Sequence, residues 1–102
     1  MDQADVTNKL IAVLEQVQAI SGEACPTLDG SLKPAESLPK FDSKVWPVAA
    51  GMLAAAIGEH IPPEANIFVD ETTKQALTIN QTVALVCFII ENQKKALAAA
   101  AA

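Results

Sequence analysis

The sequence contains no tyrosine, and its aromatic residues are one tryptophan and three phenylalanines among 102 residues. Alanine supplies much of the 51% hydrophobic fraction, and alanine favours helices because it loses no side-chain entropy there. The composition therefore predicts a light helical domain rather than a β-sandwich. A chain of this length forms one domain with a modest core, which leaves little mass for a large catalytic cleft.

Basic residues and long apolar runs are also scarce. Seven Lys and Arg face twelve Asp and Glu, and the net charge of −5 argues against non-specific nucleic-acid binding. The uncharged runs at residues 45–58 and 76–90 are shorter than the roughly 20 apolar residues of a membrane-spanning helix. Polar first residues and only two cysteines predict neither a signal peptide nor a disulfide framework. We therefore expect a reduced cytoplasmic protein without membrane insertion.

Three segments have the apolar spacing of helices. Residues 4–21 are the first, with Asp2 or Asp5 able to cap the start and Gly22 able to end it. The side chains expected to face the core from this segment are Val6, Leu10, Ile11, Val13, Leu14, Val17 and Ile20.

Residues 43–58 form the second segment, with Asp42 or Ser43 as the cap and Gly58 at the exit. Its expected inward side chains are Val45, Val48, Met52 and Ile57. Residues 78–95 form the third, where Thr78 and Gln81 have the spacing of a capping box. Its core stripe is Ile79, Val83, Val86 and Ile90. The run 83–90 is apolar all round, so a buried strand is the competing interpretation there.

Two connections join these helices. In residues 22–42 the prolines at 26, 34 and 39 are expected to break any regular element, while apolar residues hold the loop on the core. Those apolar residues are Leu28, Leu32, Leu38 and Phe41. Residues 59–77 are predicted to be irregular, with a short helical turn either between Pro63 and Phe68 or around residues 71–77. We expect an all-α bundle of three main helices and a short fourth in residues 1–95, followed by a frayed alanine-rich tail, 96–102.

Catalytic and metal-binding patterns are weak. A nucleophilic pair would need His60 with Cys25 or Cys87, but Cys87 falls on the apolar stripe and Cys25 lies in a loop before a proline. A metal site would have to gather His60 with acids at positions 59, 64 and 70, which lack ligand spacing. We therefore predict no catalytic residue and no metal site, and a protein that is not an enzyme.

The order of the remaining motifs resembles the acyl carrier protein family. A first amphipathic helix is followed by a long loop that ends in Phe41-Asp42-Ser43, and a second helix follows directly. That helix runs into Ile61-Pro62, eighteen residues after the serine, which is the spacing of bacterial acyl carrier proteins. An irregular segment and a last helix opened by residues 77–79 complete a resemblance that covers about residues 6–92.

The resemblance implies that Ser43, with Asp42 as its motif neighbour, receives a 4′-phosphopantetheine group from coenzyme A through a phosphopantetheinyl transferase. The arm would hold an acyl chain as a thioester for acyl-transferring and chain-elongating enzymes of fatty acid, lipid or polyketide-type biosynthesis. A phosphodiester at Ser43 would face free backbone amides and the positive end of a helix dipole. A monomer is expected, because a carrier is handed between enzymes.

The second helix departs from the family pattern. Lys44 follows the serine where the family usually has Leu or Met, and Val48, Ala54 and Ala55 stand where the family has acids. Docking of partners is therefore expected to be mainly apolar, through Val45, Trp46 and Val48 beside Lys44. Trp46 is either an exposed anchor or a core residue that closes the bundle.

Pro47 leaves two positions open for the start of the second helix. The helix can bend near its start, or it can begin later with Pro47 at the favoured first helical position and Ser43 on the loop; we favour the later start. An unmodified carrier-like interaction module remains the alternative function. A third possibility is an unrelated small helical protein in which Ser43 is only a cap.

Overall fold

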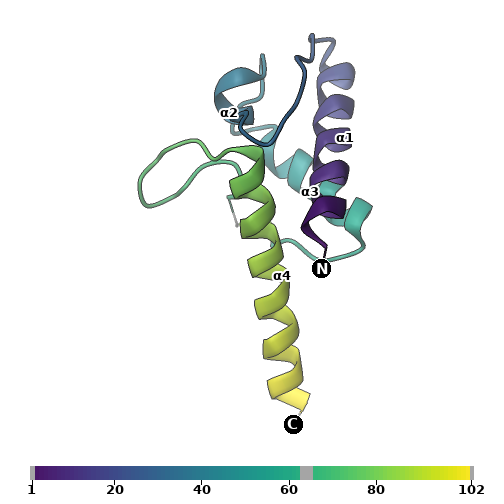
Figure 1. Cartoon of the computed structure of the whole chain (residues 1–102), viewed down its shortest axis with the longest axis vertical. Coiled ribbons are helices and arrows are strands. Elements are labelled where there is room, and N and C mark those ends of the chain that lie inside the picture. The colour runs from purple at the N-terminus through teal and green to yellow at the C-terminus, as the bar shows by residue number, and fades with distance from the viewer. Residues whose placement is uncertain (1, 63–65, 102) are drawn as a thin grey trace.

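The computed structural model describes residues 2–62 and 66–101, with side chains as far as residue 97. Four helices follow one another along this described part of the chain (Figure 1). They are α1 (Gln3–Ser21), α2 (Pro34–Ser37), α3 (Trp46–Ile57) and α4 (Ile79–Ala101). The described residues contain no strand beyond one isolated bridge between Val69 and Ala76. The predicted all-α class, with three main helices and a short fourth, is confirmed.

Helix α1 has the caps and most of the inward face that its sequence predicts. The Asp2 side chain accepts a 3.0 Å hydrogen bond from the Ala4 amide, and Gly22 ends the helix at φ 73°, a left-handed conformation that suits glycine. Ile20 is the exception, because it is 80% exposed. Ile20 belongs to the last turn of α1, which rises past the first turn of α4 along the long axis (Figure 1).

The core lies where α1 packs against α3 and α4. The predicted stripe of α4 is buried, and so is Cys87. The predicted capping box is also confirmed: the Gln81 side chain accepts from the Thr78 amide at 2.9 Å, and Thr78 Oγ1 accepts from the Gln81 amide at 3.1 Å. Residues 79–101 are helical, so the strand alternative for 83–90 is wrong and the helix extends past its predicted end at 95. The predicted boundary between a helical domain, residues 1–95, and an alanine-rich tail, residues 96–102, stays a prediction.

Helix α3 begins at Trp46, so the later start is confirmed. Pro47 is the second helical residue rather than the predicted first, and it still lies in the first turn, where the missing N–H would have had no intrahelical partner. The buried face consists of Ala49, Ala50 and Leu53, whereas Val48 is 58% exposed and its predicted inward position is wrong. Since small alanines let the helices approach closely, the contact centres on them, and Val48 is rotated by about 100° from Ala49.

The first connection, residues 22–45, is closely bound to the helices. Leu38 and Phe41 are buried, and Leu28 and Leu32 pack partly against the core, as predicted. Pro34 does not break regular structure here; it opens α2, because a proline in the first helical turn removes no intrahelical hydrogen bond. The short fourth helix of the described chain, α2, therefore lies in this connection.

Carbonyl groups of the first connection also complete the start of α4. The Ile79 amide donates to the Leu32 carbonyl at 2.9 Å, and the Asn80 amide donates to the Gly30 carbonyl at 3.0 Å. The approach is so close that a Cβ atom at Gly30 would overlap the Asn80 side chain. The connection thus satisfies amides that a helix start leaves unpaired.

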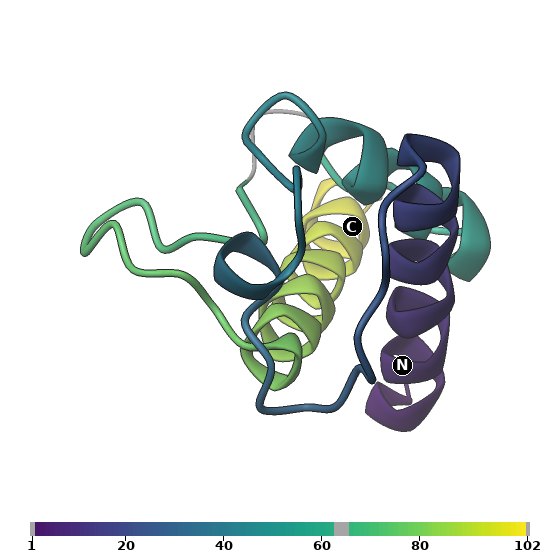
Figure 2. The ribbon, with the colours of Figure 1, turned by 90° about the horizontal axis from the view of Figure 1, so that it is seen from above.

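The second connection comprises residues 58–78, of which 63–65 are not described, and the outer part of its described portion projects from the bundle (Figure 2). Its base is buried at Ile61, Ile67 and Phe68, while residues 71–75 are exposed. The helical turn predicted around 71–77 is wrong: Asp70 and Gln75 pair through a 2.9 Å backbone hydrogen bond and enclose a hairpin-like turn. The alternative turn between Pro63 and Phe68 lies partly outside the described residues.

Candidate functional site

Ser43 lies on an exposed turn directly before α3, and Asp42 shapes that turn. The Asp42 carboxylate accepts from the Lys44 amide at 3.0 Å. The Asp42 carbonyl accepts from the amides of Val45 at 3.0 Å and Trp46 at 3.1 Å. Asp42, Ser43 and Lys44 are all exposed, so the serine hydroxyl is on the surface while the backbone beneath it is hydrogen-bonded.

Three contacts fix the chain on either side of this turn. Gln18 of α1 is 1% exposed, and its Nε2 donates to the Pro39 carbonyl at 3.0 Å. The Trp46 indole Nε1 donates to the Phe41 carbonyl at 3.1 Å. The Phe41 ring is buried and packs edge-to-face on Phe68, with ring centroids 5.0 Å apart. Contacts with α1, α3 and the second connection therefore fix the backbone on both sides of the exposed serine.

The electrostatics of the turn differ from the sequence-based expectation. The amides of Lys44, Val45 and Trp46 already donate to Asp42, and Pro47 has no N–H, so these positions offer no free amide to an anion. Two positive features remain near Ser43. One is the N-terminal end of the dipole of α3, and the other is the Lys44 ammonium, which forms no ion pair with a described residue.

The residues predicted to bind partners have different exposures. Lys44 and Val48 are exposed, whereas Val45 and Trp46 are half-buried and pack against the core. Trp46 lies between the two predicted positions: its N–H donates inward to the Phe41 carbonyl, and its ring lines a cavity of about 590 Å³. Its role as an anchor for partners stays a prediction. The sequence analysis missed the other residues that line this cavity, which are Lys33, Ala35, Glu36, Val69, Lys74, Gln75 and Ala76.

The catalytic alternatives gain no support from the described residues. Cys87 is buried, Cys25 and His60 are exposed, and no described hydrogen bond joins His60 to either cysteine. Although Cys25 is exposed, partial desolvation by its neighbours raises the pKa of its thiol, and the nearby Glu15 carboxylate raises the same pKa further, which lowers the fraction of reactive thiolate. Within the described ranges, no cluster of three or more His, Cys, Asp or Glu side chains could hold a metal ion; Glu64 lies outside them.

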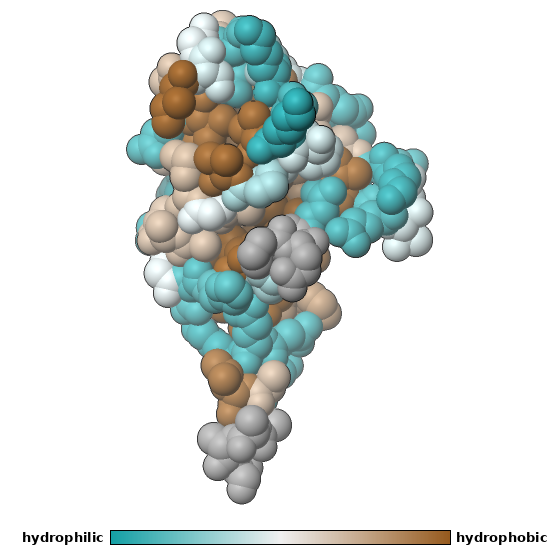
Figure 3. All heavy atoms as spheres, turned by 180° about the vertical axis from the view of Figure 1, so that it is seen from behind, coloured by the Kyte–Doolittle hydropathy of each residue, from teal (hydrophilic) through white to brown (hydrophobic). Residues whose placement is uncertain are grey.

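Large exposed apolar side chains are distributed over three helices. They are Ile20 on α1, Val48 on α3, and Phe88 and Leu97 on α4. On the rear face, hydrophilic side chains interrupt the apolar areas (Figure 3). No helix in the described part of the chain combines the length and the apolar character needed to span a membrane.

Fold and site together define a small all-α domain that presents an exposed serine on the turn before a helix. Comparison of the chain with protein-family models, with curated proteins and with solved structures found no match.

Proposed function

We propose that the chain is an acyl carrier protein whose Ser43 carries 4′-phosphopantetheine. A phosphopantetheinyl transferase would attach the group, and acyl-transferring and chain-elongating enzymes of fatty acid, lipid or polyketide-type synthesis would act on the thioester. The carrier itself catalyses no step. It works as a monomer in the cytoplasm.

The position of Ser43 carries the proposal. A transferase must bring the serine oxygen to the β-phosphorus of coenzyme A, so the hydroxyl has to be accessible while its backbone is held in place. Ser43 is exposed, and hydrogen bonds to Asp42, Phe41 and Pro39 hold the backbone around it. A residue on a loop that a rigid scaffold positions is a favourable substrate for another enzyme.

The charges around Ser43 also support a phosphodiester there. The group carries one negative charge beside the positive end of the α3 dipole, which typically stabilises an anion by about 0.3–1 kcal/mol. Lys44, adjacent in sequence and exposed, supplies a full positive charge. This lysine stands where the family usually has Leu or Met, and its ammonium group would attract the phosphodiester, which a leucine side chain could not do.

Incubation with coenzyme A and a broad-specificity phosphopantetheinyl transferase tests the proposal. Intact-protein mass spectrometry should show the addition of one phosphopantetheine, and peptide mapping should locate it on Ser43. Ser43→Ala should abolish the addition. Ser37→Ala is the matched control, because Ser37 is an exposed serine in the same connection, and it should be modified like the unaltered chain.

Two results would contradict the carrier function. One is the absence of any adduct on the unaltered chain, which would favour the unmodified interaction module. The other is an adduct that persists in Ser43→Ala, which would show that the group is attached elsewhere.

A further inference from the structure

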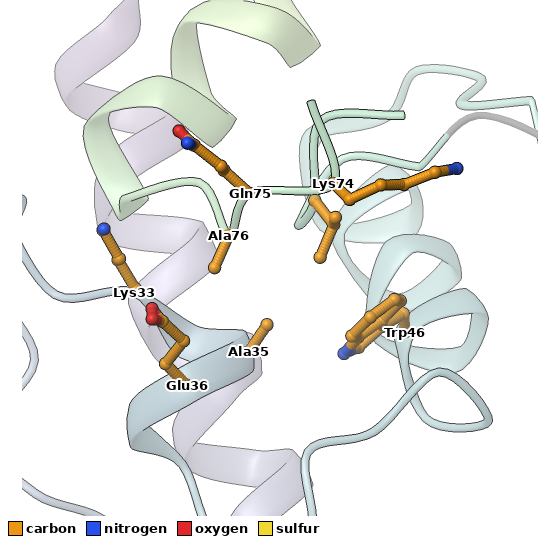
Figure 4. A pocket seen from close by; sticks show the side chains of 8 residues that line it. Lys33, Ala35, Glu36, Trp46, Lys74, Gln75 and Ala76 are labelled. Carbon is orange, nitrogen blue, oxygen red and sulfur yellow. The ribbon is translucent and has the colours of Figure 1, made fainter. Parts of the chain in front are cut away.

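The cavity beside Trp46 is formed by three segments that are far apart in the sequence. Lys33, Ala35 and Glu36 come from α2 and the residue before it, Trp46 opens α3, and residues 69 and 74–76 come from the second connection. Figure 4 shows Ala35, Ala76 and the Trp46 ring around the middle of the cavity. Apolar side chains therefore border the middle, while polar groups make up much of the remaining lining. At about 590 Å³ the space admits a bulky aliphatic or aromatic side chain.

Two lysines stand at the ends of this cavity. Lys33 and Lys74 lie on opposite sides, and their ammonium groups point away from its middle (Figure 4). Neither forms an ion pair with a described residue, a property that they share with Lys44 and Lys95, whereas Lys9, Lys40 and Lys94 each form one. The chain as a whole has a net charge of −5, whereas the two lysines outnumber the one carboxylate, Glu36, in the lining of this cavity.

The nearby carboxylates differ in what they contact. Asp70 accepts hydrogen bonds from the amides of Thr72 at 2.8 Å and Thr73 at 3.2 Å, so its carboxylate faces its own turn. Glu36 lines the cavity on the side of Lys33 and opposes an incoming negative charge there (Figure 4). The cavity lining thus carries two positive groups and one negative group.

We propose that this cavity docks an acidic segment of a partner protein, with one bulky apolar side chain beside Trp46 and carboxylates on both sides of it. A single small carboxylate cannot meet both lysines, because their ammonium groups point in opposite directions from the cavity. A polypeptide that crosses the cavity reaches both. The docking surface does not depend on modification of Ser43.

Trp46 provides a direct signal for this binding, because it is the only tryptophan of the chain and its ring borders the cavity. The indole N–H is held by the Phe41 carbonyl, so the ring stays in place and its fluorescence responds to a new neighbour. The probes are synthetic peptides in which one leucine has two glutamates on each side. In the comparison peptides lysines replace the glutamates, or alanine replaces the leucine.

Titration of the unmodified chain at low salt should give a saturable change in fluorescence with the acidic leucine peptide. Lys33→Glu and Lys74→Glu should each weaken binding on the order of tenfold, since attraction at the rim becomes repulsion. Glu36→Gln should tighten binding. Lys95→Glu is the matched control: it makes the same charge change at an exposed position outside the cavity and should leave the affinity unchanged.

Circular dichroism confirms that each variant is folded, which is expected because the substituted side chains are exposed. The proposal is overturned if the acidic peptide gives no saturable change, or if the lysine peptide binds equally well. It is also overturned if Lys95→Glu weakens binding as much as Lys33→Glu, because the effect would then be one of net charge only. The same measurements on Ser43→Ala should be unchanged.

Discussion

The two connections of this protein are both largely irregular, yet the helices bind them differently. The first, residues 22–45, receives hydrogen bonds along its length from Gln18 of α1, from Trp46 of α3 and from the first amides of α4. The second, residues 58–78, is bound mainly at its base, where the buried Thr82 hydroxyl donates to the Ile67 carbonyl at 2.8 Å. Its outer part depends on its own hydrogen bonds and stands away from the bundle (Figure 2).

This difference shows that hydrogen bonds from neighbouring helices hold irregular backbone in one conformation. Carbonyl groups that lack partners in a helix or sheet need donors, and helices provide them through side chains and through their unpaired first amides. The first connection uses both sources and presents Ser43 on a stable base. The outer part of the second connection is left at the surface, where it forms one wall of the cavity beside Trp46.

The largest expected effect comes from the point where the two connections meet. Phe68→Ala should lower the free energy of unfolding by about 3–5 kcal/mol, because it leaves a void at a side chain that is 0% exposed and removes the ring against Phe41. Phe41→Ala should have a similar effect. Urea denaturation followed by far-ultraviolet circular dichroism measures both changes.

A double-mutant cycle tests whether the two rings join the connections. Coupling of about 1 kcal/mol is expected for an edge-to-face pair. Additive effects would show that each connection is anchored independently. Phe88→Ala is the control, since this ring is 61% exposed and its loss should change stability by less than about 0.5 kcal/mol.

A smaller loss of stability is expected when each connection loses one buried hydrogen-bond donor, and its effect should be confined to that connection. Gln18→Leu and Thr82→Val each remove one buried donor at similar side-chain volume, and each should cost about 1–3 kcal/mol by leaving a carbonyl unpaired. Amide hydrogen exchange should accelerate at residues 38–46 in the first variant and at residues 67–77 in the second. Faster exchange in the same connection in both variants would contradict the separation.

The smallest effect concerns two lysines with left-handed backbone. Lys74 has φ 63° and Lys40 has φ 58°, a region that costs most non-glycine residues roughly 1–2 kcal/mol. Lys74→Gly should therefore stabilise the fold by up to about 1 kcal/mol, after the greater entropy of glycine in the unfolded chain is subtracted. Lys40→Gly should gain less, because it removes the 2.9 Å ion pair with Glu23.

Thermal unfolding of the two variants measures this difference. Lys44→Gly serves as the control, since Lys44 does not have a positive φ and glycine there should lower stability. A loss of stability in Lys74→Gly would show that the side chain contributes more to the turn than its backbone conformation costs.

Several parts of the molecule were determined by local sequence. The spacing of Val6, Leu10 and Leu14 specified the buried face of α1, and Thr78 with Gln81 specified the start of α4, because capping and helical periodicity act within a few residues. Pro47 likewise favoured a helix start close to its own position. The exposure of Ser43 followed from that start, since residues before the helix lie on the loop.

Tertiary structure decided what depended on distant neighbours. Ile20 and Val48 have the periodicity of core residues but are exposed, because burial requires a facing element and none packs there. The cavity beside Trp46 unites residues 33–36 with residues 69–76, and no local pattern links segments so far apart. The amide of Gln18 meets the Pro39 carbonyl for the same reason: local sequence determines helices and caps, whereas packing determines which distant groups become partners.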